Sequence, residues 1–296
     1  MALSVFRSLK SAYTSLNPQQ VRELAERSVV IELVADTEEA YAGMEAYLIP
    51  SITSAGDRAS GLLSLHRAAT SDRPDSADIT IYEQGIPCPK EAFIFYSDKP
   101  EQTIEDILHA RPDLEVPLAR HFLGFRQAAI HRIVGRVARE NALFTLLTAM
   151  PNVVPSFLEL PWALGEYATD SAFLTLNQIR MAFLIAAASG RSVGLSEQKA
   201  QLAAIVGSAF GWRALARELV GKIPLGGGLI PKAAISWAGT FVVGRALEQA
   251  YLTGDRIRRQ EHKALYGKAV EKGKEVATSL LSAIRKPAPA HLASDR

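Results

Sequence analysis

The fold is decided by residues 176–252, which read LNQIRMAFLIAAASGRSVGLSEQKAQLAAIVGSAFGWRALARELVGKIPLGGGLIPKAAISWAGTFVVGRALEQAYL. Three apolar helical patterns are separated here by two glycine-marked breaks. In the middle pattern, Leu202, Ile205 and Ala209 recur at three- and four-residue intervals, which places them on one face of a helix. The spacing predicts a group of apolar helices that pack against one another.

Small residues recur four positions apart in the second and third of these helical patterns. Gly207 and Gly211 lie on one face of the second predicted helix, and Ala234 and Ala238 lie on one face of the third. Such pairs let two helix backbones approach closely. They predict helix-packing positions and leave two alternatives open, a tight hairpin in or on a bilayer and ordinary close packing in a soluble bundle.

A run of three glycines separates these two helices. Gly226, Gly227 and Gly228 precede Pro231, which fits the first turn of a helix because its missing N–H costs nothing there. We interpret the run as the turn of a helix hairpin. The alternative is an anion site, since backbone amides at a helix N-terminus can bind phosphate.

Two runs in this region resemble a known family. Residues 222–246, KIPLGGGLIPKAAISWAGTFVVGRA, and residues 207–219, GSAFGWRALAREL, are similar to parts of the C-terminal helical domain of the YcjF-like family. The similarity extends over residues 140–255. This bacterial domain often follows a GTPase domain, and its relatives are described as membrane proteins. The resemblance implies a membrane-associated helical module that works with a GTPase or with itself as an oligomer, and it offers no catalytic residues to carry over.

The N-terminal third of the chain has a different rhythm. Continuous β-branched runs predict buried strands, and the segments between them predict helices and turns. The order strand–helix–strand–strand–helix indicates a small α/β domain. Its predicted elements are strands at residues 29–35, 79–83 and 92–96, helices at 36–48 and 100–109, and a polar loop or short helix at 56–78.

The predicted fold class is α+β. We expect an N-terminal helix and small α/β domain over residues 1–110 and an apolar helical domain over residues 111–255. A basic helix and disordered tail are expected over residues 256–296. With 296 residues, the chain can bury a sizeable core.

The first predicted strand–helix junction is where a GTPase would carry its P-loop. Residues 34–43 read VADTEEAYAG and lack the Gly-Lys-Ser/Thr ending that cradles phosphates. Asp36, Glu38 and Glu39 place three carboxylates where a phosphate would bind, and these charges repel a nucleotide. The sequence predicts no P-loop in this domain.

Asp36 and Asp98 each follow a predicted strand. Paired acids at one sheet edge could hold Mg²⁺ or perform acid–base chemistry. The alternative is that each aspartate caps the helix that follows it. The pair is the basis of the weakest functional hypothesis, a carboxylate-dependent enzyme.

No other residues form a pattern that predicts catalysis. The six histidines lack metal-ligand spacing, and Cys88 lies between two prolines without a clear activating group. This single cysteine excludes an internal disulfide framework and fits a reducing compartment. We therefore predict a protein that is not an enzyme and uses no metal or cofactor.

The C-terminal region is basic. Residues 256–286 carry Arg256, Arg258, Arg259 and Lys263 close to the apolar helices. Such cations can bind anionic lipid, or they can form a solvated helix face. Nucleic acid is disfavoured, because aromatic residues are sparse there and the formal net charge of the chain is only +2.

The apolar segments do not form a clean membrane span. Eighteen uncharged residues separate Glu140 from Glu159, but Pro151 and Pro155 interrupt them. The preferred hypothesis is a non-enzymatic, membrane-associated scaffold or GTPase-linked partner at the cytoplasmic side of a bacterial inner membrane. The alternative is a cytoplasmic helical bundle that binds an apolar ligand or a protein partner.

Overall fold

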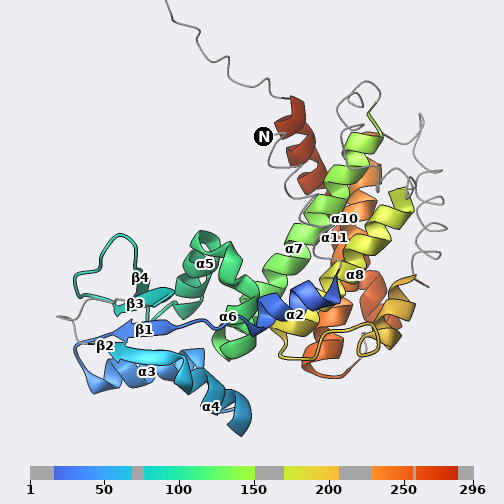
Figure 1. The fold of residues 1–296 in the computed structure, drawn as a ribbon. Coiled ribbons are helices and arrows are strands. Elements are labelled where there is room, and N and C mark those ends of the chain that lie inside the picture. The colour runs from blue at the N-terminus through green and yellow to red at the C-terminus, as the bar shows by residue number, and fades with distance from the viewer. Residues whose placement is uncertain (1–16, 69–76, 151–169, 207–227, 256–257, 286–296) are drawn as a thin grey trace, which may run out of the picture. The chain divides into compact units, whose positions relative to one another are not determined.

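A computed structural model describes residues 17–68, 77–150, 170–206, 228–255 and 258–285. These residues are mostly helical and include one small parallel sheet, which is compatible with the α+β class. The elements (Figure 1) are α2 Pro18–Glu26, β1 Ile31–Val34, α3 Glu38–Leu48, α4 Ala55–Leu63, β2 Leu65–Ala68, β3 Ile79–Glu83, β4 Phe93–Phe95, α5 Pro100–Ala110, the 3₁₀ helix η1 Pro112–Leu114, α6 Glu115–His121, α7 Leu123–Thr148, α8 Asp170–Ala188, α10 Leu229–Leu252 and α11 Arg259–Arg285.

The described residues form two compact units. The sheet unit consists of Pro18–Ile133 and Phe183–Glu197, and the helical unit contains the described parts of Val134–Ala182 and Gln198–Arg296. The division falls inside α7 and again inside α8, whereas we expected a boundary after residue 110.

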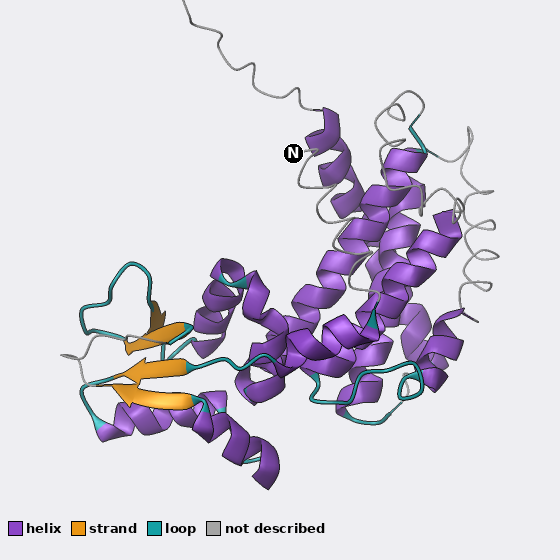
Figure 2. Cartoon of the chain, viewed as in Figure 1, coloured by secondary structure: helices purple, strands orange, loops and turns teal. Residues whose placement is uncertain are grey.

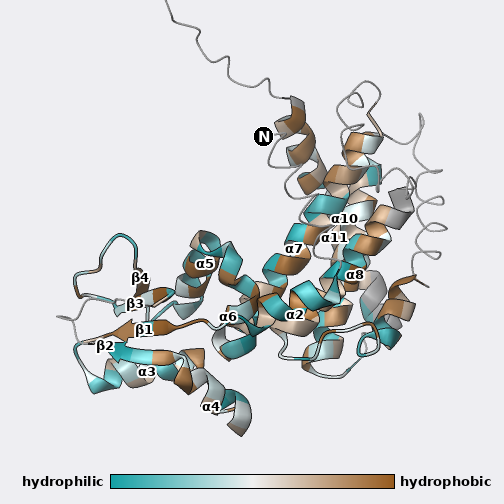
Figure 3. Cartoon of the chain, viewed as in Figure 1, coloured by the Kyte–Doolittle hydropathy of each residue, from teal (hydrophilic) through white to brown (hydrophobic). Residues whose placement is uncertain are grey.

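The sheet unit is built on four parallel strands in the order β2-β1-β3-β4. The strands are drawn as orange arrows in Figure 2. Central strand β1 is hydrophobic along most of its length (Figure 3), and its Ile31 lies opposite Leu65 of β2 and Ile79 of β3. Ile31 and Leu33 are buried on one face and Val34 is buried on the other, as expected for a parallel strand that is covered on both faces. The predictions of β1, β3 and β4 are confirmed.

Strand β2 was not predicted. Its sequence, LHRA, buries only Ala68 and carries no alternating apolar pattern. The strand exists because β1 offers it a parallel partner over residues 65–68. The preceding segment is α4, whose first turn is capped by the Ser54 hydroxyl accepting the Asp57 N–H at 3.2 Å. The expectation of a loop or short helix over residues 56–78 is therefore correct for α4 and wrong for β2.

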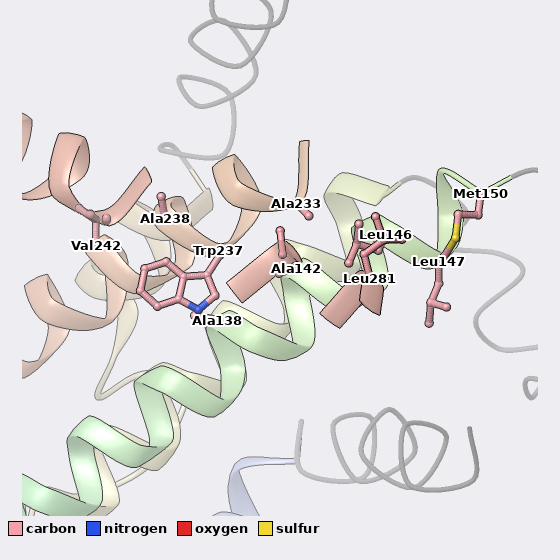
Figure 4. Packing of buried hydrophobic residues seen from close by; sticks show 12 residues of the cluster. Ala138, Ala142, Leu146, Leu147, Met150, Ala233, Trp237, Ala238, Val242 and Leu281 are labelled. Atoms are coloured by element: carbon pink, nitrogen blue, oxygen red, sulfur yellow. The ribbon is translucent and has the colours of Figure 1, made fainter. Parts of the chain in front are cut away.

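The core of the helical unit lies among α7, α10 and α11 (Figure 4). Most of its buried side chains are small or aliphatic, and Trp237 of α10 is the largest. Helices α10 and α11 pack against each other along their length. Buried members of this cluster include Ala138, Ala142 and Leu146 of α7, Ala233, Trp237, Ala238 and Val242 of α10, and Ala269, Ala277 and Leu281 of α11.

Two glycines allow close helix–helix contacts in this unit. A Cβ added at Gly273 of α11 would lie 2.6 Å from the carbonyl oxygen of Ala234 in α10. A Cβ at Gly244 of α10 would lie 2.5 Å from Cγ1 of Val134 in α7. Ala234 therefore lies at a close helix–helix contact, and its partner there is Gly273.

The other predicted packing and turn positions are described only in part. Ala238 is fully buried in α10. Gly228 is the N-cap of α10, with φ −55°, and no side chain caps that helix. Gly207, Gly211, Gly226 and Gly227 lie outside the described residues.

A buried polar network links α7, α8 and α10. Arg180 of α8 donates from Nη2 to Oε2 of Glu140 in α7 at 2.5 Å, and these side chains are only 4% and 8% exposed. Asn177 donates to Oδ1 of Asn141 at 2.8 Å, and Asn141 donates to Oγ1 of Thr240 in α10 at 2.8 Å. Burial lowers the pKa of the Arg180 guanidinium, and the Glu140 carboxylate opposes that shift. Breaking the pair would leave a buried charge uncompensated.

Replacing one partner of the buried ion pair should destabilise the helical unit strongly. Glu140→Leu leaves the Arg180 guanidinium buried without its carboxylate, and we expect it to lower the free energy of unfolding by about 3–5 kcal/mol. The double variant Glu140→Leu, Arg180→Met should recover most of that loss, because neither charge remains. Urea unfolding followed by circular dichroism measures both.

The matched control is the exposed ion pair of Lys272 and Glu275 in α11, in which Nζ of Lys272 lies 2.7 Å from Oε2 of Glu275. Lys272→Met should change the free energy of unfolding by less than about 1 kcal/mol. Equal effects of Glu140→Leu and Lys272→Met would contradict the role given to the network.

Replacing each of two glycines on α11 by alanine should change the free energy of unfolding in opposite directions. Gly273→Ala forces its Cβ against the Ala234 backbone and should cost about 1–3 kcal/mol in the free energy of unfolding. Gly267 has nothing within 4 Å of an added Cβ, so Gly267→Ala should stabilise by up to about 1 kcal/mol through helix propensity. The measurement is the urea midpoint of each variant, and a shift of the same sign for both would refute the close α10–α11 contact.

Candidate functional site

The order of the strands creates a crevice at the carboxyl edge of the sheet. From β1 the chain first moves outward to β2, and it then returns to the other side of β1 to form β3 and β4. The connections leaving β1 and β3 therefore diverge. In open parallel sheets, ligands bind at such a switch point, beyond the carboxyl ends of the strands.

A cleft of about 390 Å³ lies at this place in the sheet unit. One side is the N-terminal half of α3, and the other side follows the ends of β3 and β4. Its lining residues are Thr37, Glu39, Ala40, Gly43, Met44, Glu83, Gln84, Phe95 and Ser97.

Local capping fixes the α3 side of the cleft. The Thr37 hydroxyl accepts the N–H of Ala40 at 3.1 Å, which makes Thr37 the N-cap of α3. Glu38 and Glu39 occupy the first turn, where negative charge favours the helix dipole. Glu38 also forms an ion pair with Arg67 of β2. The Ala40 amide is therefore already bonded to a protein oxygen, and the carboxylates of the first turn disfavour an anion there.

The opposite side is held by a hydrogen bond and a ring contact. Oε2 of Glu83 accepts the backbone N–H of Asp36 at 3.0 Å, which ties the end of β3 to the end of β1. The Phe95 ring meets the Tyr47 ring edge-on, with centroids 5.9 Å apart. Burial, followed by the negative charge of Glu101, raises the pKa of Tyr47. The contact with Tyr47 therefore holds the apolar ring of Phe95 in a cleft that Glu39 and Glu83 also line.

All the charged residues that line the cleft are acidic. Glu39 and Glu83 are its charged lining residues, and no lysine or arginine is among the residues that line it. A cleft lined by one sign of charge concentrates ligands of the opposite sign. Within the described ranges, no group of three or more His, Cys, Asp or Glu residues is placed to hold a metal ion. The lining therefore suits an organic cation better than a phosphate.

The predicted aspartate pair does not line this cleft. Asp36 follows β1 and Asp98 follows β4, and β3 lies between these strands. Two strand spacings separate the strand ends by about 10 Å, which disfavours a shared metal ion. The capping alternative is also wrong, because Thr37 caps α3 and Lys99 is the N-cap of α5 without a side-chain hydrogen bond.

Cys88 lies near the edge of the sheet, in a partly buried position. It packs against the small cluster of Val34, Ala68 and Tyr82. Its thiol donates weakly to the Pro89 carbonyl at 3.4 Å, and burial raises the pKa of the thiol. A raised pKa lowers the thiolate fraction, so these surroundings do not favour a nucleophile.

Three of the four predicted lipid-facing cations lie at the start of α11. Arg258 precedes α11 and lies 4.0 Å from Glu261, while Arg259 and Lys263 belong to the helix. Arg256 lies outside the described residues. Further along α11, Lys274 pairs with Glu271 at 2.8 Å, as Lys272 does with Glu275. The described exposed charges of α11 are thus of mixed sign, and several of them are paired, which favours a solvated face.

The apolar character of α10 has an internal explanation. Twelve of its residues, including Trp237 and Val242, are buried by the protein itself. A helix that is apolar around its whole circumference is typical of such a core position or of a membrane span. Among the helices in the described ranges, none has the length and the hydropathy that a membrane crossing requires.

The cleft was missed in the sequence, although one of its residues, Glu39, was noted for another reason. The carboxylates of residues 36–39 argue against a P-loop, and Glu39 is now found to line a cleft with Glu83. The missing information was the strand order, because β2 had no recognisable pattern. Had β2 been identified, the order 2-1-3-4 would have indicated this edge.

Comparisons of the chain with protein-family models, with curated proteins and with solved structures found no match. The similarity of residues 140–255 to the YcjF-like family therefore stays a prediction.

Proposed function

We propose that this chain is a non-catalytic binding protein whose sheet unit takes up a small organic cation in the cleft at the carboxyl edge of the sheet. The observation that carries the proposal is a switch-point cleft whose charged lining residues are both glutamates. Ligands of open parallel sheets bind at such switch points. The negative charge of the two glutamates favours a cationic ligand.

The lining supplies each kind of contact that such a ligand needs. Glu39 and Glu83 can accept hydrogen bonds from an ammonium group, and charge-assisted bonds of this kind are the stronger ones. Thr37 and Ser97 add hydroxyl groups that can fix orientation. Phe95 offers a ring face to the cation or to its carbon skeleton. A cleft of about 390 Å³ falls in the size range of small-molecule sites.

The helical unit provides the scaffold in this proposal. Its buried ion pair and its glycine-mediated contacts give α7, α8, α10 and α11 one favoured arrangement. A unit with fixed packing can present the same surface to a partner. The resemblance to the YcjF-like family suggests a GTPase or a membrane as that partner, and this part of the proposal rests on the resemblance alone.

The binding proposal is tested by ligand-dependent thermal unfolding of the full chain. Probes are 1,4-diaminobutane and succinate, which have the same number of carbon atoms and opposite charges. At about 100 times its dissociation constant, the diamine should stabilise the sheet unit by about 2.7 kcal/mol, which corresponds to a rise of roughly 5 °C or more in the unfolding midpoint. Succinate should give no rise.

Two variants decide whether the effect belongs to the cleft. Glu83→Gln keeps an acceptor for the Asp36 N–H and removes the charge. Gly43→Leu fills the cleft, because nothing lies within 4 Å of an added Cβ there. Both should abolish the diamine shift. The control Gly267→Leu makes the same change at an open position of α11 and should retain it. A shift that survives Gly43→Leu, or no shift in the wild type, would rule out this function.

A further inference from the structure

A second cleft in the sheet unit has the opposite character. It has a volume of about 340 Å³ and is lined by α2, by α6 and by the loop over residues 190–197. Arg22, Arg120 and Arg191 line it together with Glu26 and Glu197. This cleft is independent of the carboxyl edge of the sheet, since the two share no lining residue.

The loop reaches this place through the end of α8. Gly190 has φ +74°, donates to the carbonyl of Ala187 at 3.0 Å, and is followed by Arg191, which donates to the carbonyl of Ala186 at 2.9 Å. These two bonds form a Schellman motif, which requires the left-handed conformation that glycine adopts readily. The motif ends the helix and turns the chain so that Arg191 lines the cleft.

Two arginines hold the loop through backbone carbonyl groups. Arg22 of α2 donates from Nη2 to the carbonyl of Val193 at 2.5 Å, and Arg120 of α6 donates from Nη1 to the carbonyl of Arg191 at 3.1 Å. A carbonyl group orients a guanidinium but carries no net charge. Each guanidinium has five N–H donors, so one such bond leaves donors for a ligand.

The charges in the cleft favour an anion. Three guanidinium groups face two carboxylates, Glu26 and Glu197. The Ser196 hydroxyl donates to Glu197 at 2.7 Å, and this hydrogen bond lowers the pKa of Glu197. Glu26 is exposed on α2, one helical turn after Arg22. The lining residues therefore carry three positive and two negative charges, an excess of one positive charge.

We propose that Arg22, Arg120 and Arg191 form a binding site for a phosphate monoester group. A phosphate offers three terminal oxygens, whereas a carboxylate offers two, so it can engage guanidinium groups that come from three different segments. The group can belong to a soluble phosphorylated molecule or to a phospholipid headgroup. This site goes beyond the proposed cation site and takes a ligand of the opposite charge.

The test measures phosphate binding by the full-length chain in two arms. One arm titrates inorganic phosphate by calorimetry, and the other sediments the protein with phosphatidylcholine vesicles that contain or lack phosphatidic acid. We expect binding in at least one arm. Binding of inorganic phosphate would indicate a soluble phosphorylated ligand, and binding only to vesicles with phosphatidic acid would indicate a phospholipid headgroup. The double variant Arg22→Gln, Arg120→Gln should weaken that binding by about tenfold or more, because two charge-assisted contacts are lost.

A third variant keeps the test decisive if the double variant fails to fold. Glu26→Gln leaves the arginines in place and removes a repelling charge, so it should strengthen phosphate binding by about threefold. Arg27→Gln and Glu91→Gln make the same charge changes elsewhere in the sheet unit and should alter affinity less than about twofold. The site is refuted if the wild type binds in neither arm, if the double variant binds as tightly as the wild type, or if Glu26→Gln has no effect.

Discussion

Strand β1 pairs on both sides with parallel neighbours, and the sheet unit depends on this arrangement. Ile31 and Leu33 are buried on one face of the strand and Val34 is buried on the other, so the strand is covered on both faces. Parallel neighbours require crossover connections, and α3 and α4 provide the first of them. Because β2 and β3 lie on opposite sides of β1, the connections diverge at the carboxyl edge. The cleft is a geometric consequence of that divergence, and its chemistry comes from the first turn of α3 and the end of β3.

The helical unit is specified in a different way. Apolar side chains alone would allow its helices to slide or rotate, since many apolar contacts have nearly equal energy. The hydrogen bonds from Arg180 to Glu140, from Asn177 to Asn141 and from Asn141 to Thr240 depend on the relative position of α7, α8 and α10. Gly273 fixes the approach of α10 to α11 through steric fit. The buried polar groups and the glycines at helix contacts thus both favour the observed packing of the helices.

The sequence predicted those elements whose patterns are set locally. Continuous β-branched runs identified β1 and β3, and Pro100 identified the start of α5. Strand β2 could not be identified, because its pairing with β1 and not its own composition makes it a strand. The buried Arg180 was visible as a charge within an apolar run, but its partner Glu140 lies 40 residues away. Sites built from several segments, such as the two clefts, depend on these non-local pairings and were therefore missed.

The two clefts give the sheet unit two chemically distinct positions. One presents carboxylates and a phenylalanine ring, and the other presents guanidinium groups anchored on backbone carbonyls. Both are formed by segments that the packing of the unit holds in place, so ligand uptake requires no large rearrangement of the sheet. Occupancy of either cleft would still restrict the segments that line it, which links binding to local stability.

We propose that a small organic cation occupies the carboxyl edge of the sheet. Hydrogen–deuterium exchange of the full chain with and without 1,4-diaminobutane tests it most directly, because exchange reports the opening of individual segments. We expect slower exchange in residues 37–44, 83–84 and 95–97, which contain the lining residues, and no change in α10 or α11. Unchanged exchange in these three segments, or protection confined to the helical unit, would show that the diamine does not bind at this edge of the sheet.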